Sequence, residues 1–123
     1  MKKENTEGLV DVQKLLDLMS GKKEQVKQIL KLFVEHTPPF IEEIEELYKK
    51  NDLPTIKAKV HTIKSYYGYL GNLQLNQKLN DWENHLADNT FDYDHNGMLV
   101  ELKTITEIII KKLNEIFERG DLD

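Results

Sequence analysis

The sequence LVELKTITEIIIKKLNEIFERG, residues 99–120, carries the clearest structural signal in this chain of 123 residues. Leucine and isoleucine recur at steps of three or four residues, and lysine and glutamate occupy positions between them. The apolar positions are Leu99, Leu102, Ile105, Ile109, Leu113 and Ile116. Because one turn of α-helix takes about 3.6 residues, this spacing puts them on one face. The pattern predicts an amphipathic helix that ends at Gly120.

The same periodicity recurs in four earlier stretches. It predicts a short helix over residues 12–19, a long one over 26–47, a third from Asp52 to about Leu70 and a fourth over 75–86. Pro38 and Pro39 remove backbone donors inside the second stretch, so we expect either one bent helix or two nearly collinear ones there. No stretch shows the sustained two-residue alternation of a strand. The predicted fold class is all-α, an antiparallel four-helix bundle with a short additional N-terminal helix.

The composition is that of a single globular domain, with 39% hydrophobic and 32% charged residues. We expect residues 1–8 to be a flexible N-terminal tail and residues 9–119 to form one helical domain. No apolar run is long enough to cross a bilayer, and residues 1–8 lack the apolar core of a secretory signal, so we expect no membrane insertion. The chain has no cysteine, which excludes disulfides and favours a reducing, cytoplasmic location. A net charge of -5 argues against nucleic-acid binding, and a monomer is the default expectation.

The predicted third helix contains AKVHTIKSYYGYLGN, residues 58–72, in which a lysine follows a histidine by three positions. Its core face consists of Ile56, Val60, Ile63, Tyr67 and Leu70. His61 points away from that face, so we expect its ring to be exposed to solvent. The residues within about 60° of His61 around the helix are Lys57, Ala58, Lys64, Ser65, Gly68 and Asn72.

This face has the residues that a phosphoryl acceptor needs. An exposed neutral imidazole is a nucleophile near neutral pH, and Lys64 and Lys57 would offset the charge of the phosphoryl oxygens. Gly68 costs the helix about 1 kcal/mol relative to alanine, which is understandable if a partner must approach closely there. The chain has no glycine-rich phosphate loop and no kinase motifs. We therefore predict a phosphoryl carrier without its own ATP site rather than an enzyme.

The segment His61-Thr62-Ile63-Lys64-Ser65-x-x-Gly68-x-Leu70-Gly71 resembles the signature of histidine-containing phosphotransfer (HPt) domains, H-x-[LI]-K-[GS]-x-x-[small]-x-[LI]-G. The stretches 30–58 and 75–83 also resemble the helices before and after the family's histidine. The resemblance implies a four-helix bundle whose exposed histidine exchanges phosphoryl groups with aspartates of response-regulator receiver domains, in a pathway with a (hybrid) sensor histidine kinase. It also implies that this chain needs no cofactor, because the Mg²⁺ belongs to the receiver.

By this resemblance, His61 is the phosphorylated nucleophile, Lys64 the charge stabiliser and Gly68 the small residue that allows docking. Lys57 is added from helical geometry alone. The expected partner contacts are Ala58, Ser65, Gly68, Tyr69 and Asn72. The sequence departs from the family at three tyrosines, residues 66, 67 and 69, and Ser65 replaces the commoner glycine. These departures bear on how the helix packs and on which receivers fit. Tyr67 is expected to point inward and Tyr69 to lie near His61.

Simpler interpretations compete with this one. A surface histidine with an incidental lysine nearby is common, and the alternative function is a helical adaptor that binds receivers or other proteins without being phosphorylated. The other histidines, residues 36, 85 and 95, are scattered over different elements, so we expect no metal site. Residues 92–97 match the first half of an EF-hand loop, but Lys103 stands where the loop needs its glutamate. We therefore expect Asp94 or Asn96 to lie near a helix cap instead. The glutamates at 42, 43, 45 and 46 are expected to form a solvated face.

Overall fold

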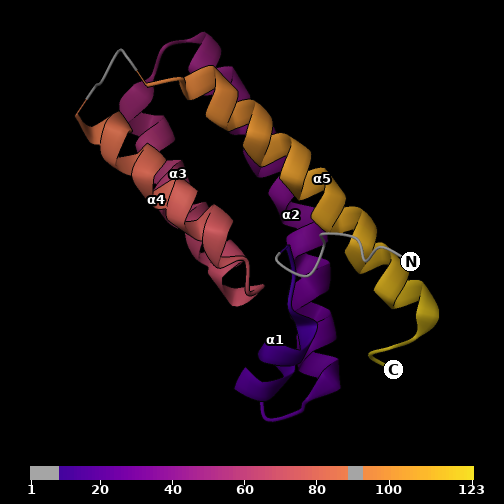
Figure 1. The fold of residues 1–123 in the computed structure, drawn as a ribbon. Helices are drawn as coiled ribbons and strands as arrows, with labels where there is room; N and C mark the ends of the chain where they lie inside the picture. The colour runs from indigo at the N-terminus through magenta and orange to yellow at the C-terminus, as the bar shows by residue number, and fades with distance from the viewer. Residues whose placement is uncertain (1–8, 89–92) are drawn as a thin grey trace, which may run out of the picture.

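The computed structural model describes residues 9–88 and 93–123, and every regular element in these ranges is an α-helix (Figure 1). The helices are α1 (Val12–Leu18), α2 (Lys23–Lys49), α3 (Leu53–Tyr69), α4 (Leu73–Ala87) and α5 (His95–Arg119). The all-α prediction, a bundle with a short extra helix at its start, is confirmed. The tail expected over residues 1–8 lies outside the described residues. None of the described helices combines the length and the apolar character needed to span a membrane.

Most of the helices begin at an aspartate or asparagine whose side chain caps the first turn. Asp11, Asp52, Asn72 and Asp94 each accept a hydrogen bond from the backbone N–H three residues later. The cap at Asp94 confirms the prediction of a helix start there, whereas Asp92 of the EF-hand-like sequence lies outside the described residues. Because of these caps, α4 begins at Leu73 and α5 at His95. The apolar pattern in the sequence began a few residues later, at Leu75 and Leu99. At the other end of α5, Gly120 adopts a φ of 74° that favours glycine.

The two adjacent prolines do not divide α2. The helix runs without interruption from Lys23 to Lys49, so one helix forms rather than two. Pro38 and Pro39 remove two hydrogen bonds that would have reached carbonyls one turn earlier. Buried residues flank them on both sides, including Phe33 and Ile41, and this burial keeps the helix in register with the core.

The core fixes the rotation of α3 about its own axis. In Figure 1, α3 and α4 form one antiparallel pair, α2 and α5 lie alongside, and α1 lies against the first half of α2. Tyr67 of α3 is fully buried, as predicted. Its ring meets Phe33 edge-on at 5.5 Å between centroids, and its hydroxyl lies 2.8 Å from Thr106 Oγ1 on α5. Since Tyr67 and its neighbours on that side point inward, the opposite side of α3 faces solvent.

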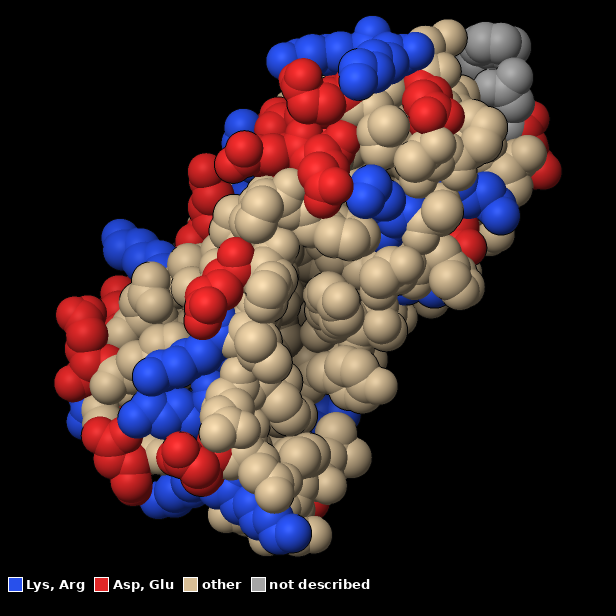
Figure 2. Space-filling model, turned by 180° about the vertical axis from the view of Figure 1, so that it is seen from behind, with Lys and Arg blue, Asp and Glu red and all other residues tan. Residues whose placement is uncertain are grey.

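Charged side chains are unevenly distributed over the surface. Figure 2 shows them concentrated toward the margins of one face, with a broad uncharged band along its middle. Glu42, Glu43 and Glu46 are exposed on α2, as expected for a solvated face, and Glu45 is half-buried. Glu43 and Glu45 pair with Lys59 and Lys103 respectively, at 3.4 and 3.3 Å.

Candidate functional site

His61 lies in the middle of α3, on the side opposite the core. Its side chain is 65% exposed, and Ala58 and Ser65, one turn before and after it, are exposed as well. The hydroxyl of Ser65 donates to the Thr62 carbonyl at 3.2 Å, so this side chain lies close to its own helix. The surface around the imidazole is therefore low and open to another molecule.

The neighbouring helix supplies a partner for the imidazole. Glu83 of α4 places Oε2 at 2.8 Å from His61 Nδ1. An ionised carboxylate has no hydrogen to donate, so Nδ1 must carry the proton of this hydrogen bond. In the neutral ring, the lone pair available for reaction then belongs to Nε2. Glu83 thus selects the tautomer in which Nε2 keeps its lone pair.

The same carboxylate holds the lysine of the motif. Lys64 Nζ donates to Glu83 Oε1 at 2.7 Å and to Asn80 Oδ1 at 2.9 Å. Asn76 Nδ2 donates to the Lys64 carbonyl at 2.8 Å, which adds a link between α3 and α4. The Lys64 side chain is 22% exposed, so its ammonium group lies against α4 rather than projecting into solvent. Lys64 is linked to the imidazole through Glu83, which contacts both groups.

The environment of Glu83 keeps it ionised. Burial alone would raise the pKa of this carboxyl, because only 13% of the side chain is exposed. The hydrogen bonds from Lys64 and then from His61 outweigh that effect and hold the pKa of Glu83 below its ordinary value. The carboxylate is therefore available as an acceptor for both groups at neutral pH.

The other residues predicted for the site fall into two groups. Lys57 and Gly68 are half-buried on the His61 side of α3, and Tyr69 is 58% exposed. Asn72 is different, because it is 2% exposed and its Oδ1 accepts from the Leu75 N–H at 3.0 Å. The expectation that Asn72 contacts a partner is wrong. The helical projection failed there because α3 ends at Tyr69 and Gly71 turns the chain with a φ of 83°.

Three residues of the site, Asn76, Asn80 and Glu83, were missed by the analysis of the sequence. They lie on one face of α4, at spacings of four and three residues. A polar stripe beside the apolar one was visible in this stretch, but its direction toward His61 depends on how α3 and α4 pack. In the described part of the chain, no group of three or more His, Cys, Asp or Glu residues is arranged to hold a metal ion.

A helical bundle that presents an exposed, hydrogen-bonded histidine and a motif lysine on one helix has the arrangement expected of a histidine phosphotransfer module. The family model described as Hpt domain matches residues 28–117, which include α3, α4 and most of α2 and α5. The match covers well over half of the chain, and the chain belongs to the Hpt domain family. Comparisons with curated proteins and with solved structures found no match.

Proposed function

We propose that His61 carries a phosphoryl group between the aspartates of two receiver domains in a phosphorelay. Membership of the Hpt domain family supports a histidine-containing phosphotransfer module of two-component signalling. The observation that carries the finer proposal is the hydrogen bond from His61 Nδ1 to Glu83, which leaves Nε2 of an exposed ring free to react.

The chemistry follows from this tautomer. The lone pair of Nε2 attacks the phosphorus of a receiver's aspartyl phosphate, the P–O bond to the aspartate breaks, and the carboxylate leaves with the electron pair. The product ring is a phosphoimidazolium that retains its Nδ1 proton. Glu83 stabilises this new positive charge, and Lys64 keeps Glu83 ionised and in place. The reverse step delivers the phosphoryl group to the next receiver. This exchange requires no nucleotide site in this chain, and the receiver supplies the Mg²⁺.

The docking surface is the exposed side of α3. Ala58, Ser65 and Gly68 give the receiver a low surface around His61, and Tyr69 is exposed at its edge. Lys57, one turn before His61, adds positive charge near the phosphoryl group. A sensor kinase as the source of the phosphoryl group, a monomeric state and a cytoplasmic location remain predictions.

The test is transfer of labelled phosphate from a phosphorylated receiver. Wild type is expected to acquire the label and His61→Gln to acquire none, whereas His36→Gln, a change at another exposed histidine, should behave as wild type. Label on His61→Gln at the wild-type rate would refute the assignment. Receiver binding without any labelling of the wild type would replace the carrier by the adaptor.

A further inference from the structure

Two asparagines of α4 hold the two ends of the same lysine. Asn76 Nδ2 donates to the Lys64 carbonyl at 2.8 Å, and Asn80 Oδ1 accepts from Lys64 Nζ at 2.9 Å. The two asparagines are one helical turn apart, so both face α3. Asn76 contacts only the backbone of the lysine, whereas Asn80 contacts the charged group itself. Asn80 is therefore the one of the two that bears directly on the chemistry of the site.

The ammonium group of Lys64 has three N–H donors, and α4 accepts from two of them. One donates to Glu83 Oε1 at 2.7 Å and the other to Asn80 Oδ1 at 2.9 Å. Within residues 9–88 and 93–123, Nζ has no third acceptor at hydrogen-bond distance. Because the N–H bonds of an ammonium group are tetrahedral, two fixed acceptors also fix the direction of the third bond. With Glu83 as its only acceptor, the group would be free to rotate.

The side chain at position 80 holds the lysine without adding charge. An amide oxygen is a neutral acceptor, whereas a carboxylate there would carry a full negative charge. Glu83 and Lys64 already form an ion pair of balanced charge. A second carboxylate would therefore leave excess negative charge beside a phosphoryl group, which is itself an anion. The amide of Asn80 orients Lys64 and avoids this repulsion.

We propose that Asn80 is a positioning residue for phosphoryl transfer, which directs the third N–H of Lys64 toward an oxygen of the phosphoryl group on His61. This role rests on the proposed function, because it belongs to the same reaction. Lys64 contacts the phosphoryl group, and Asn80 acts through Lys64. Without Asn80, the ammonium group keeps its contact with Glu83 but samples several orientations, and only some of them serve the transfer.

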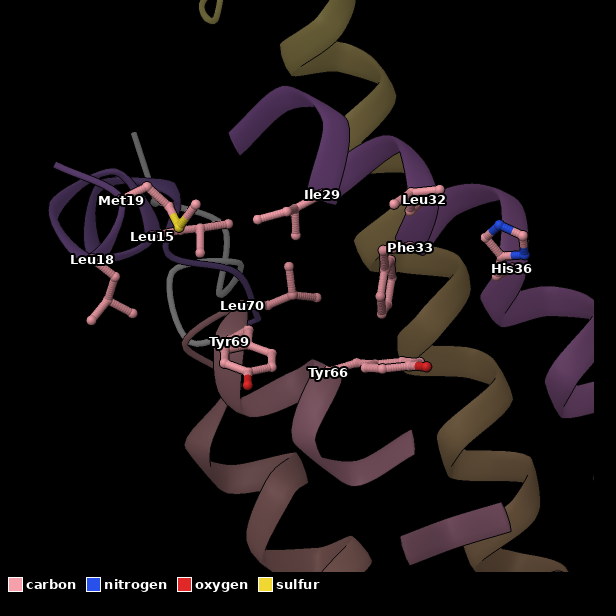
Figure 3. A pocket seen from close by; sticks show the side chains of 10 residues that line it. All are labelled: Leu15, Leu18, Met19, Ile29, Leu32, Phe33, His36, Tyr66, Tyr69 and Leu70. Atoms are coloured by element: carbon pink, nitrogen blue, oxygen red, sulfur yellow. The ribbon is translucent and has the colours of Figure 1, made fainter. Parts of the chain in front are cut away.

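Asn80 lies apart from the end of the docking surface at Tyr69. Figure 3 shows Tyr66, Tyr69 and Leu70 at the end of α3, where they line a groove that faces α1 and α2. Among the described residues that line this groove, none belongs to α4. A change at Asn80 should therefore leave this part of the surface intact and alter the rate of transfer more than the affinity for the receiver.

The first experiment observes the ammonium group in the unphosphorylated chain. Exchange with water broadens the 1H–15N NMR signal of an exposed lysine ammonium group, whereas a hydrogen-bonded and shielded group exchanges more slowly. We expect a resolved Nζ signal in wild type, assigned by its absence from Lys64→Met. Asn80→Leu, which has a similar volume and no acceptor, should lose the signal. The matched control Asn84→Leu, at an exposed asparagine of the same helix, should keep it.

The second experiment measures transfer from a phosphorylated receiver by rapid quench over a range of receiver concentrations. Asn80→Leu should lower the rate constant at saturation about fivefold or more and leave the KM unchanged. Asn84→Leu should behave as wild type. In a Lys64→Met background, adding Asn80→Leu should cause no further loss, because the two residues act as one unit. Asn80→Ala should give the same results as Asn80→Leu and replaces it if the leucine variant does not fold.

Three results would overturn the role of Asn80 alone. They are a Nζ signal that persists in Asn80→Leu, a transfer rate equal to that of wild type, and a loss of rate that is equally large in the Lys64→Met background. The last result would show that Asn80 supports the fold rather than the lysine. A wild type that takes no label from a phosphorylated receiver gives a different result, since it would overturn the proposed function and this role together.

Discussion

Replacing Gly68 by alanine should make the protein more stable and a poorer partner for its receiver. A Cβ at this position would lie 3.4 Å from Asn76 Nδ2 and 3.8 Å from Asn76 Cγ, which is ordinary van der Waals contact. The φ angle of Gly68 is not positive, so alanine can adopt the same backbone conformation without strain. Alanine favours a helix interior over glycine by about 0.8–1.0 kcal/mol. The free energy of unfolding should therefore rise by about 1 kcal/mol, and the melting temperature by roughly 4 °C.

The effect on binding should have the opposite sign. Gly68 lies two turns after His61 on the proposed docking surface, where an added methyl group would hold a closely packed receiver away. Overpacking by one methyl group typically costs about 1–3 kcal/mol, so the Kd for the receiver should rise about fivefold or more. Urea unfolding followed by circular dichroism measures the first effect, and calorimetric titration with the receiver measures the second.

A second glycine in a helix provides the control. At Gly97 a Cβ would lie 2.2 Å from Asp94 Oδ2, the carboxylate that caps α5. Gly97→Ala should therefore lower stability and leave receiver binding unchanged. If Gly68→Ala were destabilising, the glycine would be required by packing. If it were stabilising with unchanged affinity, the proposed docking surface would be wrong.

Three further substitutions test the site and the core. Glu83→Gln should slow phosphorylation of His61 at least tenfold in quench-flow, because a neutral amide stabilises the phosphoimidazolium less; an unchanged rate would remove Glu83 from the mechanism. Folding lowers the pKa of Glu83 below its ordinary value of 4.5. The ionised carboxylate therefore stabilises the fold fully when the pH is above 4.5, and this stabilisation is lost as the pH falls through the lower folded-state pKa. The stability deficit of Glu83→Gln at pH 7 should accordingly shrink in acid, and a deficit independent of pH would contradict this. Tyr67→Phe should lower the free energy of unfolding by about 1–2 kcal/mol, because the hydroxyl of Thr106 loses its partner. Adding Thr106→Val should restore most of that free energy in urea unfolding. A double variant that loses twice as much as Tyr67→Phe would contradict this. Thr37→Val should raise the free energy of unfolding by about 1 kcal/mol, since Thr37 Oγ1 is buried with no hydrogen-bond partner in the described structure; a loss of stability would show that the hydroxyl is satisfied.

The helices could be predicted from the sequence because their determinants are local. The spacing of apolar residues depends only on the 3.6-residue turn, and the capping residues act within three positions of themselves. Asp52 and Asp94 were identified in this way. The interior position of Tyr67 also followed, because it lies on the apolar side of a regular helix. The prediction for Asn72 failed where regularity ends, since an angle calculated for a continuous helix has no meaning beyond the turn at Gly71.

The hydrogen-bond network around His61 could not be predicted, because it depends on the register of two helices. His61 and Lys64 are on α3, whereas Asn76, Asn80 and Glu83 are on α4. A shift of α4 by one residue would rotate its polar stripe by about 100° and take Glu83 away from the imidazole. The tight turn at residues 70–72, in which Asn72 caps α4, limits such a shift. Asn72 is therefore buried and still affects the site, because as the cap of α4 it helps to set the register that brings Glu83 to His61.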